Sequence, residues 1–518
     1  MTGNMYGKKT MKLKLIAAIS LFALAAAPAH AGLDEGKAAY ERGDYAAALK
    51  EIRPLAEKGD PVAQNGMGML YANGQGVPRD EAEAMKWWRK AADQGYAKAQ
   101  SNVGVLYMLG RGVKEDGAEA AKWFRRAAEQ GYADAQSFLG NWYLNGPGAA
   151  RDDAEALKWT SRAAAQGEAR AQYNMGRIHA QGRGVARDDA EAAKWYRKAA
   201  DQGLARAQNT LGTLYMHGRG VAKDEAEANK WFRMAVEQGL AAAQTNLGVS
   251  YVAGRGVARD HAKAAKLFRL AAEQGDPDAQ AKLGYMYFQG MGVAQDDAEA
   301  VKWTRRAAEQ GVDEAQSNLG AMYADGRGVA KDEAEAVKWY RSAAEQGYPP
   351  GQNNLGSMYL DGLGVARNEA EAEKWLRRSA DQGYAIAQNN LGNLYANGQG
   401  VARDDAEAVK WYRKAADQGY SHAQSNLGYM YEKGLSVPED EAEAMKWYRR
   451  AADQGYAMAQ FNVGAMYASG RGVARDTAEA AKWMRLAADQ GYAPAREVLN
   501  KLGKKGDADS RQDRSARP

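Results

Sequence analysis

The sequence contains no cysteine, and this absence excludes several kinds of chemistry. Without thiols the chain forms no disulfide, no thiolate metal site and no cysteine nucleophile. It also has no cysteine to carry the lipid anchor of a bacterial lipoprotein. The histidines beyond residue 31 are isolated in the sequence, and none has the spacing of metal ligands: His179, His217, His261 and His422. We therefore expect no metal and no cofactor.

Motifs of common enzyme classes are missing as well. No serine is followed three residues later by lysine, the arrangement of one group of serine nucleophiles. No glycine-rich loop follows a predicted strand, so the Gly-x-Gly-Val segments are not nucleotide motifs. Pairs of Asp and Glu are abundant, but helix capping accounts for their spacing. The sequence predicts a protein that is not an enzyme.

Long apolar runs are also absent, apart from one near the N-terminus, from Leu15 to Ala27. Four lysines precede this run, and Ala29-His30-Ala31 offers the small residues that a signal peptidase prefers. This order predicts a secretory signal peptide, residues 1–31, cleaved after Ala31. An uncleaved membrane anchor is the alternative, but the run is short for a bilayer. Translation from Met1 or from Met11 fits the pattern equally.

The signal peptide also changes the charge of the chain. The full sequence has a net charge of +5, and residues 1–31 contain four lysines and no acid. The mature chain is therefore close to neutral, and no excess of basic residues supports nucleic-acid binding. We expect no stable membrane insertion after cleavage and a periplasmic location, with full secretion as the alternative.

Tryptophan, in contrast, recurs every 36 residues along most of the chain. Eleven tryptophans share this phase, and only Leu267 departs from it. Twelve positions at one spacing indicate twelve copies of one unit, in which each copy buries its apolar face against its neighbours. Each tryptophan is expected to pack in the core and not to bind a sugar or a cation. Leu267 is a conservative replacement that predicts a looser joint and no active site.

One unit, residues 421–455, illustrates the predicted structure. Ala423, Leu427 and Tyr431 recur at helical spacing and lie on one face of a first helix. Gly428 stands in mid-helix, where glycine costs about 1 kcal/mol in isolation. Because glycine returns at this position in every unit, we expect it to permit close contact between helices. Gly434 ends the first helix.

The second helix of this unit begins at an acidic N-cap. Asp440 is followed three residues later by Glu443, an arrangement typical of a capping box. Trp447 lies on the apolar face, basic residues follow it as the helix dipole favours, and Gly455 ends the helix. The unit is therefore helix, short glycine loop, helix and glycine turn.

These residues resemble the Sel-one-like repeat family, a relative of the tetratricopeptide repeats. The shared pattern is A-x-A-Q-x-x-L-G-x-x-Y-x-x-G-x-G-V-x-x-D-x-x-x-A-x-K-W-x-x-x-A-A-x-Q-G, and one copy runs from Ala385 through Trp411 to Gly419. The resemblance covers about residues 61–495. It implies an all-α fold, an α/α superhelical solenoid, that serves as a scaffold for other proteins and carries no reaction.

The predicted domain organisation follows from the repeats. Residues 32–60 are expected to form an N-terminal capping half-repeat, and residues 61–494 the twelve repeats. Residues 495–502 are expected to form a C-terminal capping helix, because capping elements cover the ends of such stacks. Residues 503–518 are predicted to be a disordered polar tail.

Partner binding is predicted at positions that vary between units. Counted from the recurrent glutamine of each first helix, the first, fifth, eighth and ninth positions vary and, by similarity to tetratricopeptide units, face a concave groove. Amides and aromatics there suit an extended peptide. The candidate binding residues are Tyr173, Arg177, Asn209, His217, Tyr285, Phe288, Gln289, Asn353, Asn389, Asn393, Tyr429 and Phe461.

Asparagine also recurs two residues after the glutamine. A ladder that grips a peptide is one interpretation, but a recurrent position beside the core favours a structural role, with hydrogen bonds to neighbouring backbone.

The predicted function is a non-catalytic exported scaffold that binds a protein or an extended peptide. A protein that binds envelope carbohydrate or peptidoglycan is the alternative, since tyrosines and amides also suit sugars. An exported hydrolase with a site between repeats is a further, weaker alternative.

Overall fold

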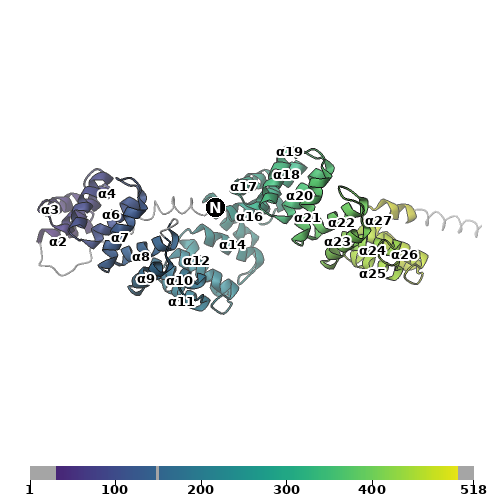
Figure 1. Cartoon of the computed structure of the whole chain (residues 1–518), viewed down its shortest axis with the longest axis horizontal. Helices are drawn as coiled ribbons and strands as arrows, with labels where there is room; N and C mark the ends of the chain where they lie inside the picture. Colours follow the sequence, from purple (N-terminus) through teal and green to yellow (C-terminus); the bar gives the residue numbers. More distant parts are fainter. Residues whose placement is uncertain (1–30, 147–150, 500–518) are drawn as a thin grey trace, which may run out of the picture. The chain divides into compact units, whose positions relative to one another are not determined.

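The computed structural model describes residues 31–146 and 151–499, and these residues form helices and no strand. Two helices, α2 (Ala31–Glu41) and α3 (Tyr45–Glu57), precede twelve helix pairs (Figure 1). The first helices of the pairs are α4 (Pro61–Asn73), α6 (Ala97–Leu109), α8 (Ala133–Asn145), α10 (Ala169–Gln181), α12 (Ala205–His217), α14 (Ala241–Ala253), α16 (Pro277–Gln289), α18 (Asp313–Asp325), α20 (Pro349–Asp361), α22 (Ala385–Asn397), α24 (Ser421–Lys433) and α26 (Ala457–Ser469). The second helices are α5 (Glu81–Asp93), α7 (Gly117–Glu129), α9 (Asp153–Ala165), α11 (Asp189–Asp201), α13 (Glu225–Glu237), α15 (His261–Glu273), α17 (Asp297–Glu309), α19 (Glu333–Glu345), α21 (Glu369–Asp381), α23 (Asp405–Asp417), α25 (Glu441–Asp453) and α27 (Thr477–Asp489).

The chain forms two compact units, with the boundary between Arg259 and Asp260. The first unit includes α2 to α14, and the second includes α15 to α27. Within each unit every helix packs against the next one along the chain (Figure 1). This arrangement confirms the predicted all-α solenoid. The boundary falls in the loop before α15, the helix that carries Leu267.

The two helices of a pair approach closely at the mid-helix glycine. A Cβ atom on Gly392 would lie only 2.6 Å from the Tyr412 ring, and one on Gly428 would lie 2.9 Å from the Tyr448 ring. The residue after each recurrent tryptophan therefore packs directly against the backbone of the first helix. The prediction that these glycines permit close helix contact is confirmed for the pairs described.

The recurrent tryptophans pack between consecutive repeats, as predicted. Trp375 is 6% exposed and contacts Tyr340 of α19 and Met358 of α20 in one hydrophobic cluster. The guanidinium of Arg378 lies 4.7 Å from the ring centroid, so the outer part of the indole is covered by the cation. Most members of the series are buried to the same degree, and Trp87, Trp195 and Trp339 are half-buried.

Glutamine side chains link consecutive helices in a ladder that the sequence analysis did not predict. Gln418, at the C-cap of α23, donates through Nε2 to Gln388 Oε1 at 2.7 Å. Gln388 in turn donates to the carbonyl oxygen of Ala380 in the preceding second helix at 3.1 Å. The same pattern recurs along both units, so the recurrent glutamine holds three helices in register.

In the second helices one of the two hydrogen bonds of the predicted capping box is present. The Asp440 carboxylate accepts from the Glu443 N–H at 2.8 Å, as a capping residue does. However, the Glu443 carboxylate pairs with Lys446 at 2.8 Å and does not reach back to the N-cap. The reason is that the Asp440 N–H already donates to the Tyr431 carbonyl of the first helix at 3.1 Å. The glutamate is therefore free to pair along its own helix.

Glycine recurs at the second glycine position of the loops for a steric reason. Gly112 has φ +68°, and a Cβ atom there would lie 2.5 Å from the carbonyl oxygen of Glu81 in α5. The loop thus lies directly on the first turn of the preceding second helix, where only glycine fits without a shift. Ser436 occupies this position in one repeat with a positive φ of 55°.

At the N-terminal end, α2 and α3 form a packed helix pair that covers α4. At the other end, residues 493–499 are helical, and Ala495 is buried against Ala487 and Ala488. The predicted signal peptide before Ala31 and the predicted tail at 503–518 lie outside the described residues. No helix within 31–146 or 151–499 is long and apolar enough to cross a membrane.

We expect Trp375→Ala to destabilise the second unit locally by about 3–5 kcal/mol, because a large buried side chain leaves a cavity. In a one-dimensional stack this loss should divide denaturant unfolding, followed by circular dichroism, into two transitions. Lys374→Ala, on the exposed face of the same helix, is the control and should change stability by less than about 0.5 kcal/mol. One unchanged transition in the Trp375 variant would contradict the packing described.

Candidate protein-binding surface

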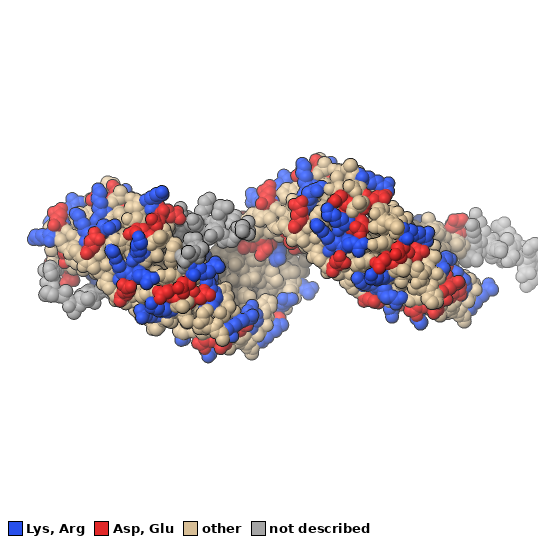
Figure 2. Space-filling view, viewed as in Figure 1, with Lys and Arg blue, Asp and Glu red and all other residues tan. Residues whose placement is uncertain are grey.

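The outer face of the second helices carries charges that neutralise each other. Glu335 and Lys338 are 2.7 Å apart, and the equivalent glutamate–lysine pair is present on most second helices. Figure 2 shows basic and acidic side chains interspersed over the visible face of each unit. Such exposed pairs contribute about 0.2–1 kcal/mol each. In each of these helices the pair neutralises one acidic and one basic side chain of the outer face.

The first helices expose a different kind of surface. In α22 one face carries Ile386, Asn390 and Asn393, which are half-buried, and Asn397, which is exposed. These residues lie at the second position before and the second, fifth and ninth positions after Gln388. Spacings of four, three and four residues place these side chains on one helix face. We call the equivalent residues of all first helices the first-helix stripe. In α22 this stripe has no charged residue.

The structure corrects the prediction for the first position after the glutamine. Asn353 and Asn389 were predicted to line a groove, but they are only 6% and 5% exposed. The position faces the first helix of the next repeat, so its side chain is covered. Others at this position are also buried: Asn65, Ser101, Ser137, Thr245, Ser317 and Ser425.

The recurrent asparagines have a structural role, but with a different partner from the one predicted. Asn390 Nδ2 donates to Asn353 Oδ1 at 3.0 Å, and Asn426 Nδ2 donates to Asn389 Oδ1 at 2.9 Å. Each bond joins the first helices of consecutive repeats through side chains and not through backbone. Asn393 belongs to this network, since its Oδ1 accepts from Asn426 Nδ2 at 3.3 Å and also from the Tyr412 hydroxyl at 2.8 Å.

Four of the predicted binding residues are well exposed. Tyr285 and Tyr429 are 51% and 50% exposed, and both belong to the first-helix stripe. His217 and Gln289 are also exposed, at the C-terminal ends of their helices. Within the described residues no group of three or more acidic or histidine side chains is placed to hold a metal ion. The four exposed side chains are available for contact with a partner.

The other predicted binding residues are half-buried and engaged within the chain. The Phe288 ring lies 3.8 Å from the guanidinium of Arg327. Arg177 donates to Asn145 Oδ1 at 3.0 Å, and Asn209 Oδ1 accepts from Asn246 at 2.9 Å.

Two of these engaged residues are aromatic and pack on other rings. The Tyr173 ring centroid lies 5.3 Å from that of Tyr196, and Phe461 lies 5.5 Å from Tyr492. The structure thus separates the candidates into exposed residues and residues that hold the stack together.

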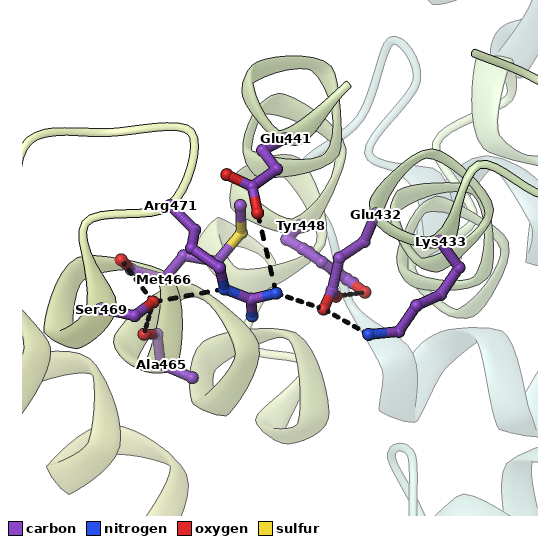
Figure 3. Close-up of polar contacts among 8 residues, drawn as sticks. All are labelled: Glu432, Lys433, Glu441, Tyr448, Ala465, Met466, Ser469 and Arg471. Atoms are coloured by element: carbon purple, nitrogen blue, oxygen red, sulfur yellow. Dashed lines mark hydrogen bonds and ion pairs between the residues drawn. The ribbon is translucent and has the colours of Figure 1, made fainter. Parts of the chain in front are cut away.

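Glu432 is the one charged residue at a position that is apolar in the other repeats, the eighth after the glutamine. Its side chain is 11% exposed and lies between α24 and α25 (Figure 3). Tyr448 Oη donates to Glu432 Oε2 at 2.8 Å, while Lys433 and Arg471 lie 3.0 and 2.9 Å from Oε1. Arg471 comes from the loop after α26, so the cluster joins two repeats.

These contacts set the ionisation of the cluster. Burial favours a raised pKa for Glu432, but hydrogen bonds from Lys433, Tyr448 and Arg471 together hold that pKa below its ordinary value. Burial, and then the negative charge of Glu432, raise the pKa of the Tyr448 hydroxyl. Both carboxylate oxygens of Glu432 therefore have partners within the chain, and the cluster links two consecutive repeats.

The sequence analysis did not single out the residues at the start of each first helix. In the second unit a tyrosine precedes α20, α22, α24 and α26, and an uncharged residue follows two positions later. A signal was present in the sequence, because residues 348–350, 384–386, 420–422 and 456–458 read YPP, YAI, YSH and YAM. The sequence analysis counted positions forward from the recurrent glutamine, so the residues before it were not compared between repeats.

Comparison with known proteins identifies the repeat. A family model described as Sel1 repeat matches twelve consecutive segments of 36 residues, from 61–96 to 457–492. The structure is similar to that of a protective antigen present in uropathogenic Escherichia coli strains that displays an SLR fold. That match has 40% identity and a TM-score of 0.69, and covers 81% of this chain and 90% of the antigen.

A second similar structure is a Sel1 repeat protein from Oxalobacter formigenes. It has 35% identity and a TM-score of 0.48, and the match covers 60% of this chain and 90% of that protein. A comparison with curated proteins found no match.

We expect Glu432→Gln to lower the free energy of unfolding of the second unit by about 1–2 kcal/mol at neutral pH, because charged hydrogen bonds are lost. A lowered folded-state pKa stabilises the fold above the ordinary pKa, and this contribution is lost as pH falls through the folded value. The difference between wild type and variant should therefore begin to shrink as the pH falls below the ordinary glutamate pKa of about 4.3, and should vanish once the pH lies below the lowered pKa of the folded state. Urea unfolding at a series of pH values measures it.

The matched control is Glu443→Gln, which removes an exposed partner of Lys446. This change should have a small effect of less than about 1 kcal/mol. A difference for Glu432→Gln that stays constant between neutral and acidic pH would contradict the role assigned to the carboxylate.

Proposed function

The chain belongs to the Sel1 repeat family, whose repeats generally mediate protein interactions, and we propose that it is a non-catalytic scaffold that binds an extended polypeptide along its first-helix stripe. The stripe varies in chemistry between repeats, and some of its side chains, Tyr285 and Tyr429 above all, are half exposed. The outer face of the second helices, in contrast, is occupied by paired charges. This contrast between the two faces is the observation that carries the proposal.

The chemistry of the stripe supports a polypeptide as the partner. The stripe of α22 contains three asparagines, and that of α24 contains Asn426 and the half-exposed Tyr429. Side-chain amides pair with peptide N–H and C=O groups, and aromatic rings contact apolar side chains. Because hydrogen bonds between repeats already hold Asn390 and Asn426, these amides lose little conformational entropy on binding.

The proposal includes export. The N-terminal order of lysines, apolar run and small residues supports secretion across the inner membrane, with the periplasm as the site of action. The partner would then be a protein of the cell envelope. Binding of cell-wall glycan is the alternative that the exposed Tyr285 and Tyr429 favour.

We expect Tyr285→Ala to weaken capture of envelope proteins by the purified chain at least threefold, because it removes a ring that is half exposed on the stripe. Capture from envelope extract is quantified by mass spectrometry, and circular dichroism checks that helicity is unchanged. Lys338→Ala, on the outer face of α19, is the control and should leave capture unaltered.

Three results would count against the proposal. Wild-type chain that retains no envelope protein would remove the scaffold function. Sedimentation with cell-wall sacculi, lost in the Tyr285 variant, would favour glycan binding instead. Turnover of generic ester, lactam or glycan substrates would indicate an enzyme.

A further inference from the structure

Along most of the stack an arginine of a second helix contacts a tyrosine of the next first helix. Arg341 Nη2 donates to Tyr359 Oη at 2.7 Å, and Arg305 makes the same bond to Tyr323 at 2.7 Å. The arginine stands two residues after the recurrent tryptophan position, and the tyrosine stands seven residues after the recurrent glutamine. We call this pairing the arginine–tyrosine contact.

Both members of the contact are replaced at one place, between α9 and α10. Arginine occupies its position in eleven of the twelve repeats, and tyrosine likewise occupies its own in eleven. The exceptions are Ser161 in α9 and His179 in α10, which stand in the places of two contacting residues. Two otherwise uniform positions therefore change together, and they are the two partners of a single contact.

The replacement side chains do not restore the contact. Serine is too short to reach the place of a guanidinium, and Ser161 Oγ donates instead to the Lys158 carbonyl oxygen of its own helix at 3.0 Å. Among the described residues the His179 imidazole forms no hydrogen bond, and it is half-buried. The place that a guanidinium occupies in other repeats therefore has no occupant from these two residues.

In other repeats this arginine also covers the tryptophan of the following second helix. The guanidinium of Arg197, which donates to the Tyr215 hydroxyl, lies 4.9 Å from the ring centroid of Trp231. Arg89 lies 4.6 Å from the ring centroid of Trp123. The two tryptophans are 6% and 2% exposed, so the arginine contributes to the cover of the indole.

Trp195, which follows the replaced contact, is covered less well. Lys198 lies 4.0 Å from its ring centroid, and Lys414 lies 3.9 Å from that of Trp411, so the two rings receive the same cover from their own helices. Yet Trp195 is half-buried, whereas Trp411 is 3% exposed. The repeat of Trp411 has the arginine–tyrosine contact through Arg377, and the repeat of Trp195 lacks it.

The two other half-buried tryptophans differ from Trp195 in their surroundings. Trp339 lacks the cation of its own helix, because Ser342 stands where Lys198 stands in α11. Trp87 packs against the N-terminal helix pair, which lies outside the twelve repeats. At Trp195 the missing side chain is the arginine of the preceding second helix.

A carboxylate completes the surroundings of the missing guanidinium. In the preceding repeat Arg125 lies 3.7 Å from Glu155 and is 43% exposed, while Glu155 also holds its own lysine at 2.7 Å. Glu191 of α11 occupies the equivalent position. The hydrogen bond from Lys194 lowers the pKa of Glu191 most, and the charge of His179 lowers it further, so the imidazole lies near this carboxylate.

The geometry points to this place, between α9, α10 and α11, as a docking site for an arginine side chain of a partner polypeptide (Figure 1). We call it the open arginine site, and it consists of Ser161, His179, Glu191 and Trp195. Trp195 offers ring surface, Glu191 a carboxylate, and His179 a ring nitrogen that accepts a hydrogen bond when neutral. A guanidinium stacks on aromatic rings and donates to carboxylates through its planar fork.

The composition of the other repeats favours arginine over other occupants. Lysine never replaces arginine at this position, although the next position, which lies over the tryptophan of its own helix, accepts Arg126, Lys198, Met234 and Ser342. The surroundings that the repeats share are therefore suited to a guanidinium and not to cations in general. An anionic ligand would meet the carboxylate of Glu191.

The open arginine site lies on a different surface from the first-helix stripe. The stripe contains the second, fifth and ninth positions after the glutamine, and His179 is at the seventh. With 3.6 residues per turn, the seventh position is about half a turn away from each of these. The inference therefore goes beyond the proposed function and concerns a second contact, in the first unit.

Fluorine NMR of the full chain labelled with 5-fluorotryptophan tests the site, with the Trp195 resonance assigned through Trp195→Phe. The probe is acetyl-Gly-Arg-Gly-amide, compared at equal ionic strength with peptides that carry lysine or neutral citrulline in place of arginine. The Trp195 resonance should shift saturably with the arginine peptide. The dissociation constant should be at least threefold higher for the lysine peptide and at least tenfold higher for the citrulline peptide.

A double variant that restores the contact of the other repeats is the decisive comparison. Ser161→Arg with His179→Tyr should keep its helicity, and its Trp195 resonance should no longer respond to the arginine peptide. Ser161→Ala is the matched control, because the Ser161 hydroxyl bonds only within its own helix, and it should respond as wild type does.

Two further variants test the carboxylate and the transfer of the site. Glu191→Gln should weaken binding of the arginine peptide at least threefold, while Glu335→Gln, at the equivalent position of α19, should not. Arg377→Ser with Tyr395→His removes the contact beside Trp411, whose resonance should then respond to the peptide. The restored double variant decides the inference even if this transferred site does not fold.

Three outcomes would overturn the inference. These are a Trp195 resonance that does not respond to the arginine peptide, an equal response to citrulline, and an unchanged response in the restored double variant. If the chain captures envelope proteins while Trp195 stays silent, this inference alone is wrong. If Trp195 responds as expected and no envelope protein is captured, the proposed function is wrong and the open arginine site stands.

Discussion

The structure depends on the close contact between the two helices of each pair at the mid-helix glycine. At Gly392 the backbone of the first helix packs directly against the Tyr412 ring of the second helix, so closely that an added Cβ atom would lie 2.6 Å from that ring. This contact fixes which side of the first helix is buried. The recurrent glutamine and tryptophan then hold successive pairs in register. The remaining side of the first helix is left for solvent or a partner.

The division of roles between the two helices follows from this contact. Second helices carry the aromatic core on one side and glutamate–lysine pairs on the other. First helices bury small and aliphatic residues, and their stripe changes from the uncharged surface of α22 to one with charged residues such as Arg177 in α10. Variation between repeats at the stripe therefore changes the chemistry of the surface without changing the fold.

Much of the fold was predictable from the sequence, because one period of 36 residues repeats the same constraints twelve times. The helix pairs, the packing of the tryptophans and the role of Gly428 followed from spacing alone. The burial of Asn353 and Asn389 was not predictable in this way. Helix periodicity predicts which residues share a face of the helix, but not how much of that face a neighbouring repeat covers. The carboxylate of Glu443 turned away from the N-cap because a tertiary hydrogen bond, invisible in the sequence, already satisfied that N–H.

The central claim is that the first helices form the binding surface. Amide hydrogen exchange, measured on the chain with and without its captured partner, tests this claim most directly. We expect slower amide exchange on binding in first helices of the second unit, above all α20, α22, α24 and α26. Exchange in α19, α21, α23 and α25 should change little. Protection confined to the second helices, whose charges are paired, would contradict the account.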